Sequence, residues 1–353
     1  MDMATTNPGQ VSSQSVGLSP TGCFNHAALA SGRRFDAREF LSDEPLLGLQ
    51  REAGYIWGTL RDDEGVLYSL MRRIAPPGAA QGEGKSLGGK LLVVSSGTVE
   101  GQLQLRREPR GAVDSTDIVR GPHHHDAIRF ASAPGAPGRA MQLVLSENEF
   151  AYVEEGVIDV SGRIVVPPLQ WYLPGPHSAL LYLSQTWLVN GQLAGKPVRG
   201  FLFWEEAWMP PGGQLYVAKD PLQDAGYLTW YSWANLWSDG SCEVGHFLFG
   251  QNDFHVGVTA DSSGVVTSAH TMDAVITRAE DGYWHDGIAY ELDGTRWVCE
   301  PDPQGRMQGL GKMPNPQQEG RMYRVEDTRM PDVWMAWGET VPAAGERRQR
   351  RQP

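Results

Sequence analysis

Short alternating runs of apolar and polar residues dominate this chain, and long stretches with helical periodicity are scarce. Strict alternation over about four to eight residues is typical of strands that bury one face. In the first half, such runs predict strands at 55–60, 66–74, 90–96, 101–106, 127–130, 140–145, 150–157, 164–166 and 180–187. In the second half, they predict strands at 227–237, 242–250, 256–260, 265–268, 272–278, 287–292, 296–299, 322–325 and 334–339. Short strands at close spacing favour antiparallel barrels or sandwiches.

Turn residues separate the predicted strands. Asp62–Gly65 and Ser262–Gly264 are typical of hairpin turns, and Asn190-Gly191 predicts a third hairpin that leads into residues 200–212. The run 167–174 (Pro-Pro-Leu-Gln-Trp-Tyr-Leu-Pro) is kinked and aromatic. We interpret it as a crossover that covers the core, since proline cannot donate to a central strand ladder.

The length of 353 residues is large for one compact core and fits two domains of ordinary size. Residues 36–54 have helical character that Pro45 interrupts, so short helical turns are expected there. We therefore expect four parts. They are a flexible N-terminal segment with helical turns at 1–45, a first β-unit at 46–199, a second at 200–340 and a disordered basic tail at 341–353.

Charge and cysteine content narrow the function classes. The net charge of -12 argues against a nucleic-acid partner, which needs a basic face. The three cysteines, Cys23, Cys242 and Cys299, lack metal-ligand spacing, and an odd count suits a reducing compartment. A Cys242–Cys299 bridge stays open if their strands are neighbours. Residues 1–19 do not have the pattern of a secretory signal, and the chain has no apolar run long enough to span a membrane. We expect a cytoplasmic protein.

The stretch 200–212 carries the most distinctive chemistry. It begins like a strand and then places two adjacent acids, Glu205 and Glu206, between the indoles of Trp204 and Trp208. A carboxyl group held among indole rings has a raised pKa and can serve as a proton donor. The alternative is that both acids are solvent-facing charges at a strand end.

A second aromatic run follows at 227–237, in the part of the chain that holds nine of the twelve tryptophans. In an extended strand, alternate residues share a face. One face then holds Tyr227, Thr229, Tyr231 and Trp233, and the other holds Leu228, Trp230 and Ser232. These rings can line a cavity, and for each tryptophan alone core filling is the simpler interpretation.

Other polar motifs are less specific. His123-His124-His125 precedes Asp126, but neighbouring residues of a strand alternate faces, whereas zinc needs three or four converging ligands. We favour a polar loop there and expect no metal site and no cofactor. His285-Asp286 beside Trp284 is interpreted as a strand-edge loop. The nucleophile elbow of hydrolases and the phosphate-binding loop of nucleotide hydrolases are both absent from the sequence.

Three segments carry a family resemblance. Residues 188–208 resemble the segment that joins the two barrels of AttH-like double-lipocalin proteins. Residues 230–240 are similar to that family's aromatic strand with its Asp-Gly turn, and residues 319–339 to its closing strands. This superfamily includes carotenoid hydratases and lipocalin-like Diels–Alderases. The resemblance, which spans about 55–339, implies an all-β fold of two tandem antiparallel lipocalin-like β-barrels after a short helical N-terminal segment. It also implies a ligand pocket in or between the barrels.

The chain departs from the family at one informative position. Glu206 stands where the family has histidine, and Met209 with two prolines follows where the family has glycine. Proton transfer by histidine therefore does not carry over. A carboxylic acid kept neutral by burial against indole can take its place.

We therefore expect a small-molecule enzyme whose partner is an apolar substrate of terpenoid or polyene type. The expected reaction is acid-assisted hydration or dehydration, isomerisation or cyclisation, so the enzyme is a lyase or an isomerase. The expected catalytic residues are Glu206, Glu205 and Tyr231, and the expected substrate-binding residues are Phe203, Trp204, Trp208, Trp230 and Trp233. Aromatic faces can stabilise a developing carbocation.

Two alternatives remain open. A pericyclase would preorganise a flexible polyene without any titrating group, so its rate would depend on pocket shape and hardly on pH. A carrier would bind a hydrophobic ligand and return it unchanged.

Overall fold

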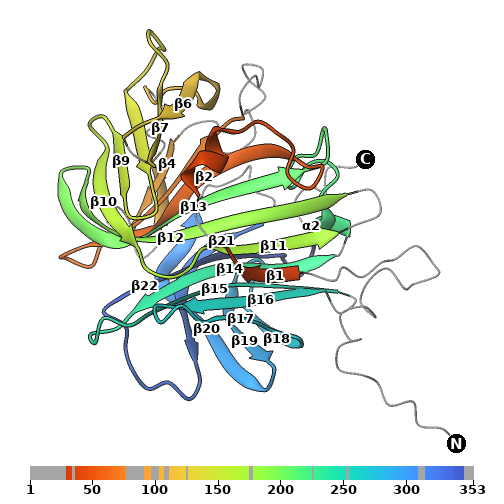
Figure 1. The fold of residues 1–353 in the computed structure, drawn as a ribbon. Helices are drawn as coiled ribbons and strands as arrows, with labels where there is room; N and C mark the ends of the chain where they lie inside the picture. Colours follow the sequence, from red (N-terminus) through yellow and green to blue (C-terminus); the bar gives the residue numbers. More distant parts are fainter. Residues whose placement is uncertain are drawn as a thin grey trace, which may run out of the picture.

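The computed structural model describes residues 29–33, 36–76, 91–96, 103–106, 111–124, 126–174, 178–224, 226–251, 254–308 and 315–345. Within these ranges, strands predominate and form two mainly antiparallel sheets that curl into half-barrels (Figure 1). The expected all-β class is therefore confirmed. Residues 1–28 and 346–353, which hold most of the expected N-terminal segment and the basic tail, lie outside the described residues.

The first sheet contains thirteen strands. They are β1 (Leu29–Gly32), β2 (Gln50–Asp62), β3 (Leu67–Ile74), β4 (Leu91–Ser95), β5 (Leu103–Arg106), β6 (Ile118–Pro122), β7 (Ile128–Ser132), β8 (Met141–Leu145), β9 (Phe150–Glu154), β10 (Ile158–Ile164), β11 (Leu169–Pro174), β12 (Ala179–Leu193) and β13 (Lys196–Met209). Pairing runs β5-β4-β3-β2-β13-β12 and then forks. The C-terminal half of β12 pairs with β10, and the sheet continues there in the order β10-β9-β8-β7-β6. The N-terminal half of β12 pairs with β11, which in turn pairs with β1.

The second sheet contains nine strands. They are β14 (Tyr227–Leu236), β15 (Cys242–Gly250), β16 (His255–Asp261), β17 (Val266–Ser268), β18 (Met272–Arg278), β19 (His285–Leu292), β20 (Thr295–Gln308), β21 (Gln317–Arg324) and β22 (Val333–Thr340). Pairing runs β17-β16-β15-β14-β22-β21-β20-β19-β18. Three short helices complete the described elements: η2 (Ala37–Leu41), η5 (Ser115–Asp117) and α2 (Pro221–Asp224).

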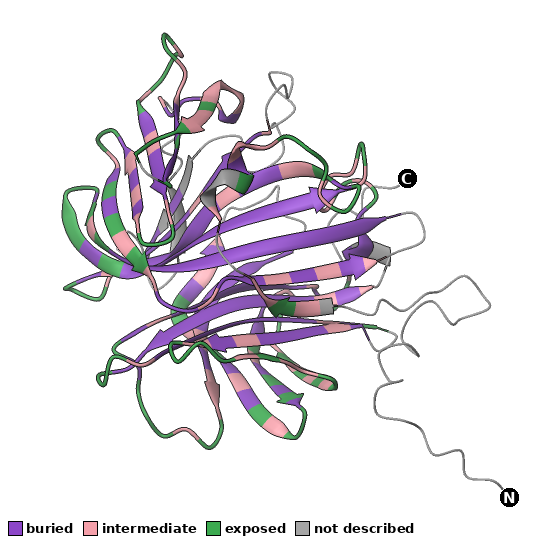
Figure 2. Ribbon diagram, in the orientation of Figure 1, coloured by how far each residue is buried: buried purple, intermediate pink, exposed green. Residues whose placement is uncertain are grey.

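The two sheets pack face to face along β11–β13 of the first and β14–β16 of the second (Figures 1 and 2). Aromatic rings fill this interface. Trp57 stacks on Phe203 with ring centroids 4.9 Å apart and meets Trp337 edge-on at 5.2 Å. Burial of such large rings contributes most of the favourable free energy at a contact of this kind.

Strand β13 is buried on both faces, and its alternation assigns each face a different neighbour. Phe201 and Phe203 point toward the second sheet and belong to the core between the sheets. Leu202 and Trp204 point into the interior of the first half-barrel and belong to its own core. Successive side chains of a strand point to opposite faces, so adjacent residues of β13 enter different environments.

One predicted hairpin forms, between β12 and β13, but its turn is not at the predicted residues. The turn between β12 and β13 lies at Ala194-Gly195, with φ of 51° and 77°, and Asn190-Gly191 lies inside β12. Gly191 has φ of 156°, and a Cβ there would lie 2.1 Å from the carbonyl oxygen of Asp159. The glycine permits close approach of β10 instead of making a turn.

Strand pairing changes three further expectations. The run 167–174 is not a crossover, because Leu169–Pro174 forms β11 and pairs with β12. Residues 50–54 belong to β2 and not to a helical segment. Residues 200–209 pair on both sides within the first sheet, so the second sheet begins at Tyr227, after the expected boundary at 200.

The expected possibility of a disulfide is also settled. Cys242 on β15 and Cys299 on β20 are both buried free thiols. They belong to different hydrophobic cores, since Cys242 packs between the sheets and Cys299 inside the second half-barrel. Cys23 lies outside the described residues.

Candidate functional site

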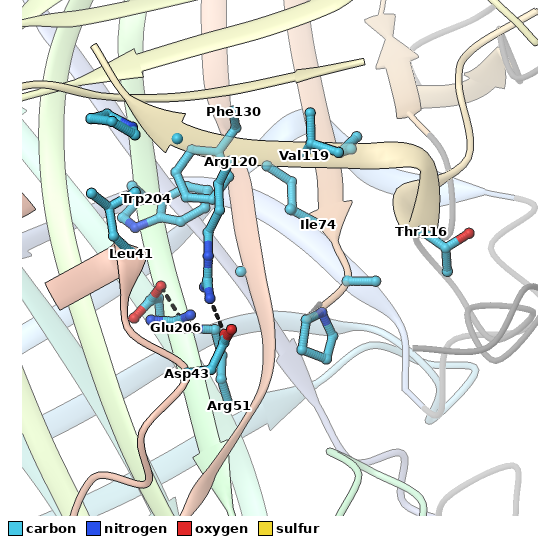
Figure 3. A pocket seen from close by; sticks show the side chains of 16 residues that line it. Leu41, Asp43, Arg51, Ile74, Thr116, Val119, Arg120, Phe130, Trp204 and Glu206 are labelled. Atoms are coloured by element: carbon cyan, nitrogen blue, oxygen red, sulfur yellow. Dashed lines mark hydrogen bonds and ion pairs between the residues drawn. The ribbon is translucent and has the colours of Figure 1, made fainter. Parts of the chain in front are cut away.

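A cavity of about 530 Å³ opens inside the first half-barrel, between η2, β2, β3, β6, β7 and β13. Its apolar wall includes Leu41, Ile74, Phe130 and Trp204, and its polar groups include Asp43, Arg51, Arg120 and Glu206 (Figure 3). Apolar walls with a few converging polar groups, at a volume of about 300–1,000 Å³, are typical of small-molecule sites.

Glu206 provides the buried acid of this cavity. Its exposed fraction is 1%. One carboxylate oxygen, Oε1, lies 3.1 Å from Nε of Arg51. The other, Oε2, accepts a hydrogen bond of 3.2 Å from the indole of Trp208. Burial raises the pKa of the Glu206 carboxyl, and the charge of Arg51 is the largest effect that opposes this rise.

Arg51 is held rigidly in place. Its Nη1 and Nη2 donate to the carbonyl oxygens of Ser42 at 3.2 Å and Glu39 at 3.3 Å, at the end of η2. Its guanidinium also lies over the ring of Trp208, 4.5 Å from the centroid. These contacts fix Arg51 as a counter-ion and position the Glu206 carboxylate.

Arg120 reaches into the cavity from β6 and points toward η2 and the loop after it (Figure 3). Its guanidinium forms an ion pair with Asp43. Burial lowers the pKa of Arg120, and the carboxylate of Glu206 opposes this effect. Arg120 is thus a second cation that lines the cavity, beside the Arg51–Glu206 pair.

Trp204 provides the aromatic wall beside Glu206. Its ring lies 5.0 Å from that of Phe130 and meets Phe40 edge-on at 5.9 Å. Gly54 on β2 leaves room for this indole, because an added Cβ would lie 2.6 Å from its Cη2 atom. The position of Trp204 therefore depends on a glycine in the neighbouring strand.

Glu205 lies on the opposite face of β13, between the two sheets, and does not line the cavity. It accepts hydrogen bonds from Tyr182 at 2.6 Å, from Ser184 at 2.9 Å and from the indole of Trp57. Burial raises the pKa of Glu205 to about 7, and these three donors limit the rise.

His246 on β15 continues the Glu205 network into the second sheet. Its Nε2 lies 3.1 Å from the hydroxyl of Ser184, and its Nδ1 lies 2.7 Å from the hydroxyl of Ser232. Burial lowers the pKa of His246 to about 3, so the ring is neutral. With the proton of the His246 ring on Nε2, the Ser232 hydroxyl donates to Nδ1, Nε2 donates to Ser184, and Ser184 donates to Glu205. Every donor of this hydrogen-bond network therefore has an acceptor.

The remaining predicted site residues lie elsewhere. Trp230 packs between the sheets, edge-on to Trp171 at 6.3 Å. Tyr231 and Trp233 point into the second half-barrel. There the Tyr231 hydroxyl lies 2.6 Å from Nε2 of His285.

The predicted site residues thus fall into three groups. Glu206 and Trp204 line the cavity of the first half-barrel, and Trp208 contacts Glu206 from a neighbouring core cluster. Glu205, Phe203 and Trp230 lie between the sheets, and Tyr231 and Trp233 lie in the second half-barrel. Sequence reasoning did not single out Arg51, Arg120 or His246. They come from β2, β6 and β15, and none stands in a recognisable motif.

Two further findings concern metal ligands and membrane spans among the residues that the structure describes. Among them, His, Cys, Asp and Glu side chains form no group of three or more that could hold a metal ion. None of the helices in these ranges has the length and apolar content needed to cross a membrane.

Comparison with family models and with curated proteins gives no match. Solved structures are similar. A putative AttH from Nitrosomonas europaea has a TM-score of 0.49 and 14% identity, over 88% of this chain and 97% of that one. CghA with Sch210972 has a TM-score of 0.45 and 8% identity, over 82% and 88%. Kievitone hydratase from Nectria haematococca has a TM-score of 0.43 and 8% identity, over 83% and 89%.

All three solved structures share low identity with this chain. Because one fold hosts many unrelated activities, the residues of the cavity, and not the fold, indicate the function.

Proposed function

We propose that this protein is an enzyme that transfers a proton to or from an apolar small molecule bound in the cavity beside Glu206. The observation that carries this proposal is the buried Glu206 carboxyl, which lines a cavity of about 530 Å³ together with Trp204 and Phe130. A titratable group with a raised pKa in an aromatic-lined cavity is the usual arrangement for general acid–base catalysis.

The chemistry follows from the neutral form of the acid. Glu206 in its protonated form donates its proton to a carbon or oxygen of the substrate, and positive charge develops on the substrate. The faces of Trp204 and Phe130 can stabilise such a charge. Hydration, dehydration, isomerisation or cyclisation of a terpenoid or polyene are the reactions that this arrangement suits best.

Arg51 and Trp208 act as positioning residues in this proposal. Once Glu206 has given up its proton, both of its oxygens face a donor, Nε of Arg51 and the indole of Trp208. These contacts stabilise the carboxylate and oppose the rise of the Glu206 pKa that burial causes. Glu205 and Tyr231 do not line the cavity, so the proposal assigns proton transfer to Glu206 alone.

One observation favours the pericyclase as a second candidate. The Arg51–Glu206 ion pair can keep the carboxylate ionised throughout, so that the cavity serves only to fold a flexible polyene between Trp204 and Phe130. The carrier is the third candidate, since an apolar cavity binds ligand with or without chemistry.

Native mass spectrometry of the purified full chain, followed by extraction, identifies a retained ligand and supplies the substrate for an assay. The reaction is then run in deuterated water. Protonation of carbon by Glu206 predicts one deuterium incorporated in the product and a rate that falls as the pH rises through the pKa of the acid. A product without deuterium and a flat pH profile would establish the pericyclase, and unchanged ligand would establish the carrier.

A further inference from the structure

The charges around the cavity are not balanced by buried partners. Arg51 has a buried counter-ion, because its Nε faces Glu206 and its other nitrogens donate to carbonyl oxygens. Arg120 differs. Its side chain is 11% exposed, whereas that of its ion-pair partner Asp43 is 65% exposed. An ion pair with a solvated carboxylate contributes only about 0–1 kcal/mol, so Asp43 neutralises the Arg120 charge poorly.

A third guanidinium adds to this imbalance. Arg33, in the segment before η2, acts on Glu206 through its charge. Its own ion-pair partner, Glu39, has a side chain that is 52% exposed. Arg51 and Arg120 thus line the cavity with one buried carboxylate, Glu206, and the charge of Arg33 acts on the same carboxylate. The side chains of Asp43 and Glu39 are largely in water, which screens their charges.

The position of Arg120 allows it to meet a ligand. Its side chain lines the cavity together with Phe130 and Trp204, and its guanidinium reaches Asp43 (Figure 3). An apolar body packed against the two rings would bring a polar end to the guanidinium. Arg binds a carboxylate with two parallel hydrogen bonds, which adds geometric specificity.

We propose that the ligand of this cavity is an amphiphilic carboxylic acid, with an apolar body against Trp204 and Phe130 and a carboxylate paired with Arg120. This inference rests on the proposed function in that it takes the cavity as the substrate site. The acid group of the ligand displaces Asp43 from Arg120 and supplies the counter-ion that the cavity lacks. It also anchors the substrate at a fixed distance from Glu206.

The test uses two probes with the same apolar chain, dodecanoate and dodecan-1-ol, below their aggregation limits at about pH 8. Binding to the full chain is measured by calorimetry. We expect dodecanoate to bind at least about tenfold more tightly than dodecan-1-ol, which corresponds to about 1.4 kcal/mol. Equal affinity for the two probes, or no binding of dodecanoate, would overturn the proposal.

Two variants test whether Arg120 causes the preference for dodecanoate over dodecan-1-ol. Arg120→Met should reduce the preference for dodecanoate to less than about threefold. Arg129→Met is the matched control, because Arg129 is exposed on the outer face of β7 and bonds Gln142. It should retain the full preference. Retention of the preference in Arg120→Met would overturn the assignment.

Asp43→Asn tests the same point without touching a buried residue. It removes the competing carboxylate and should tighten dodecanoate binding about threefold while leaving dodecan-1-ol binding unchanged. Failure of this inference and failure of proton transfer by Glu206 are distinguishable. Glu206→Gln should retain or strengthen the preference for dodecanoate whatever it does to turnover, because it removes a negative charge from the cavity.

Discussion

The two faces of β13 carry neighbouring carboxyl groups in contrasting surroundings. Glu206 lines an open cavity, with Arg51 as its ion-pair partner. Glu205 lies in the dry core between the sheets and is surrounded by neutral donors. Both are almost completely buried, with exposed fractions of 1% and 0%. Burial alone therefore does not mark a reactive acid, and access to a cavity separates the two.

The kind of partner also differs between the faces. The positive charge of Arg51 balances the negative charge of the Glu206 carboxylate, so the burial of each charge depends on the presence of the other. The hydroxyls and indole around Glu205 stabilise its charge without adding one, and they tie β13 to His246 of the second sheet. We infer that the cavity face supports chemistry and that the inter-sheet face supports packing of the two sheets.

The largest expected effect on stability is on the cavity face. Arg51→Met leaves the carboxylate of Glu206 buried without its counter-ion, and removal of one partner of a buried pair costs about 3–5 kcal/mol. Urea denaturation near neutral pH measures this loss. The double variant Arg51→Met with Glu206→Gln should recover at least half of it, because no unpaired charge remains. A double variant no more stable than Arg51→Met would contradict the pairing.

The second-largest expected effect on stability is at Glu205, on the inter-sheet face of β13, and it depends on pH. The pKa of Glu205 is raised from 4.5 to about 7, so the folded state holds this proton more tightly than the unfolded state does. The resulting stability is complete below about pH 4.5 and is lost as the pH rises through about 7. Gln cannot ionise. Glu205→Gln should therefore gain stability relative to the wild type between about pH 5 and 8, by up to about 3 kcal/mol.

Denaturation midpoints at several pH values measure this change. Glu291→Gln is the control, because Glu291 is exposed on β19 and its curve should run parallel to that of the wild type. Glu319 of the second sheet is another buried acid whose ionisation should make stability depend on pH. It accepts from Thr59 and, at 2.7 Å, from Ser69, and burial raises its pKa to about 7. A Glu205→Gln curve parallel to the wild type would show that Glu205 does not titrate in this range.

A smaller effect concerns the shape of the cavity. Gly54→Ala places a methyl group 2.6 Å from the indole of Trp204, which must move. Displacement of this ring should weaken binding of the apolar ligand about tenfold, or about 1.4 kcal/mol. Calorimetry with dodecanoate measures the change. Gly287→Ala in the second sheet should leave binding unaltered, because its nearest new contact is an ordinary 3.7 Å.

The smallest effect is at Trp208. Trp208→Phe removes the indole donor to Oε2 of Glu206 and keeps an aromatic ring under Arg51. Loss of one hydrogen bond to a buried carboxylate costs about 1 kcal/mol and raises the pKa of Glu206 further. The pH profile of turnover should shift to higher pH by less than about one unit. A shift to lower pH would contradict the assigned contact.

Alternation along the chain predicts much of the fold. It identifies most strands, and it places Tyr231 and Trp233 on one face of their strand and Trp230 on the other, as the structure shows. The same rule separates Glu205 from Glu206, since neighbouring residues of a strand point apart. The prediction nevertheless treated the two acids as one site.

Residues brought in from other strands could not be predicted. Arg51 reaches Glu206 because β2 pairs with β13, and Arg120 lines the same cavity because the first sheet curls β6 over its interior. Neither the register nor the curl is encoded in a local motif. His246 had a weak signal, because it shares a strand face with Cys242 and Val244 and is thus a polar ring on an apolar face.

The misplaced hairpin has a similar cause. Asn190-Gly191 is the strongest short-range turn signal near that position. Pairing of β10 with residues 187–193 keeps β12 extended through it, and the turn forms at Ala194-Gly195. Tertiary pairing outweighs local preference here.

The most direct test of the central claim compares turnover of Glu206→Gln and Glu205→Gln on the substrate recovered from the protein, at matched folded fractions. Loss of a general acid lowers the rate by about 100-fold to 10,000-fold. We predict a loss in kcat of at least about 100-fold for Glu206→Gln and of less than about threefold for Glu205→Gln. Full turnover by Glu206→Gln, or the larger loss in Glu205→Gln, would contradict the assignment of the chemistry to the cavity face of β13.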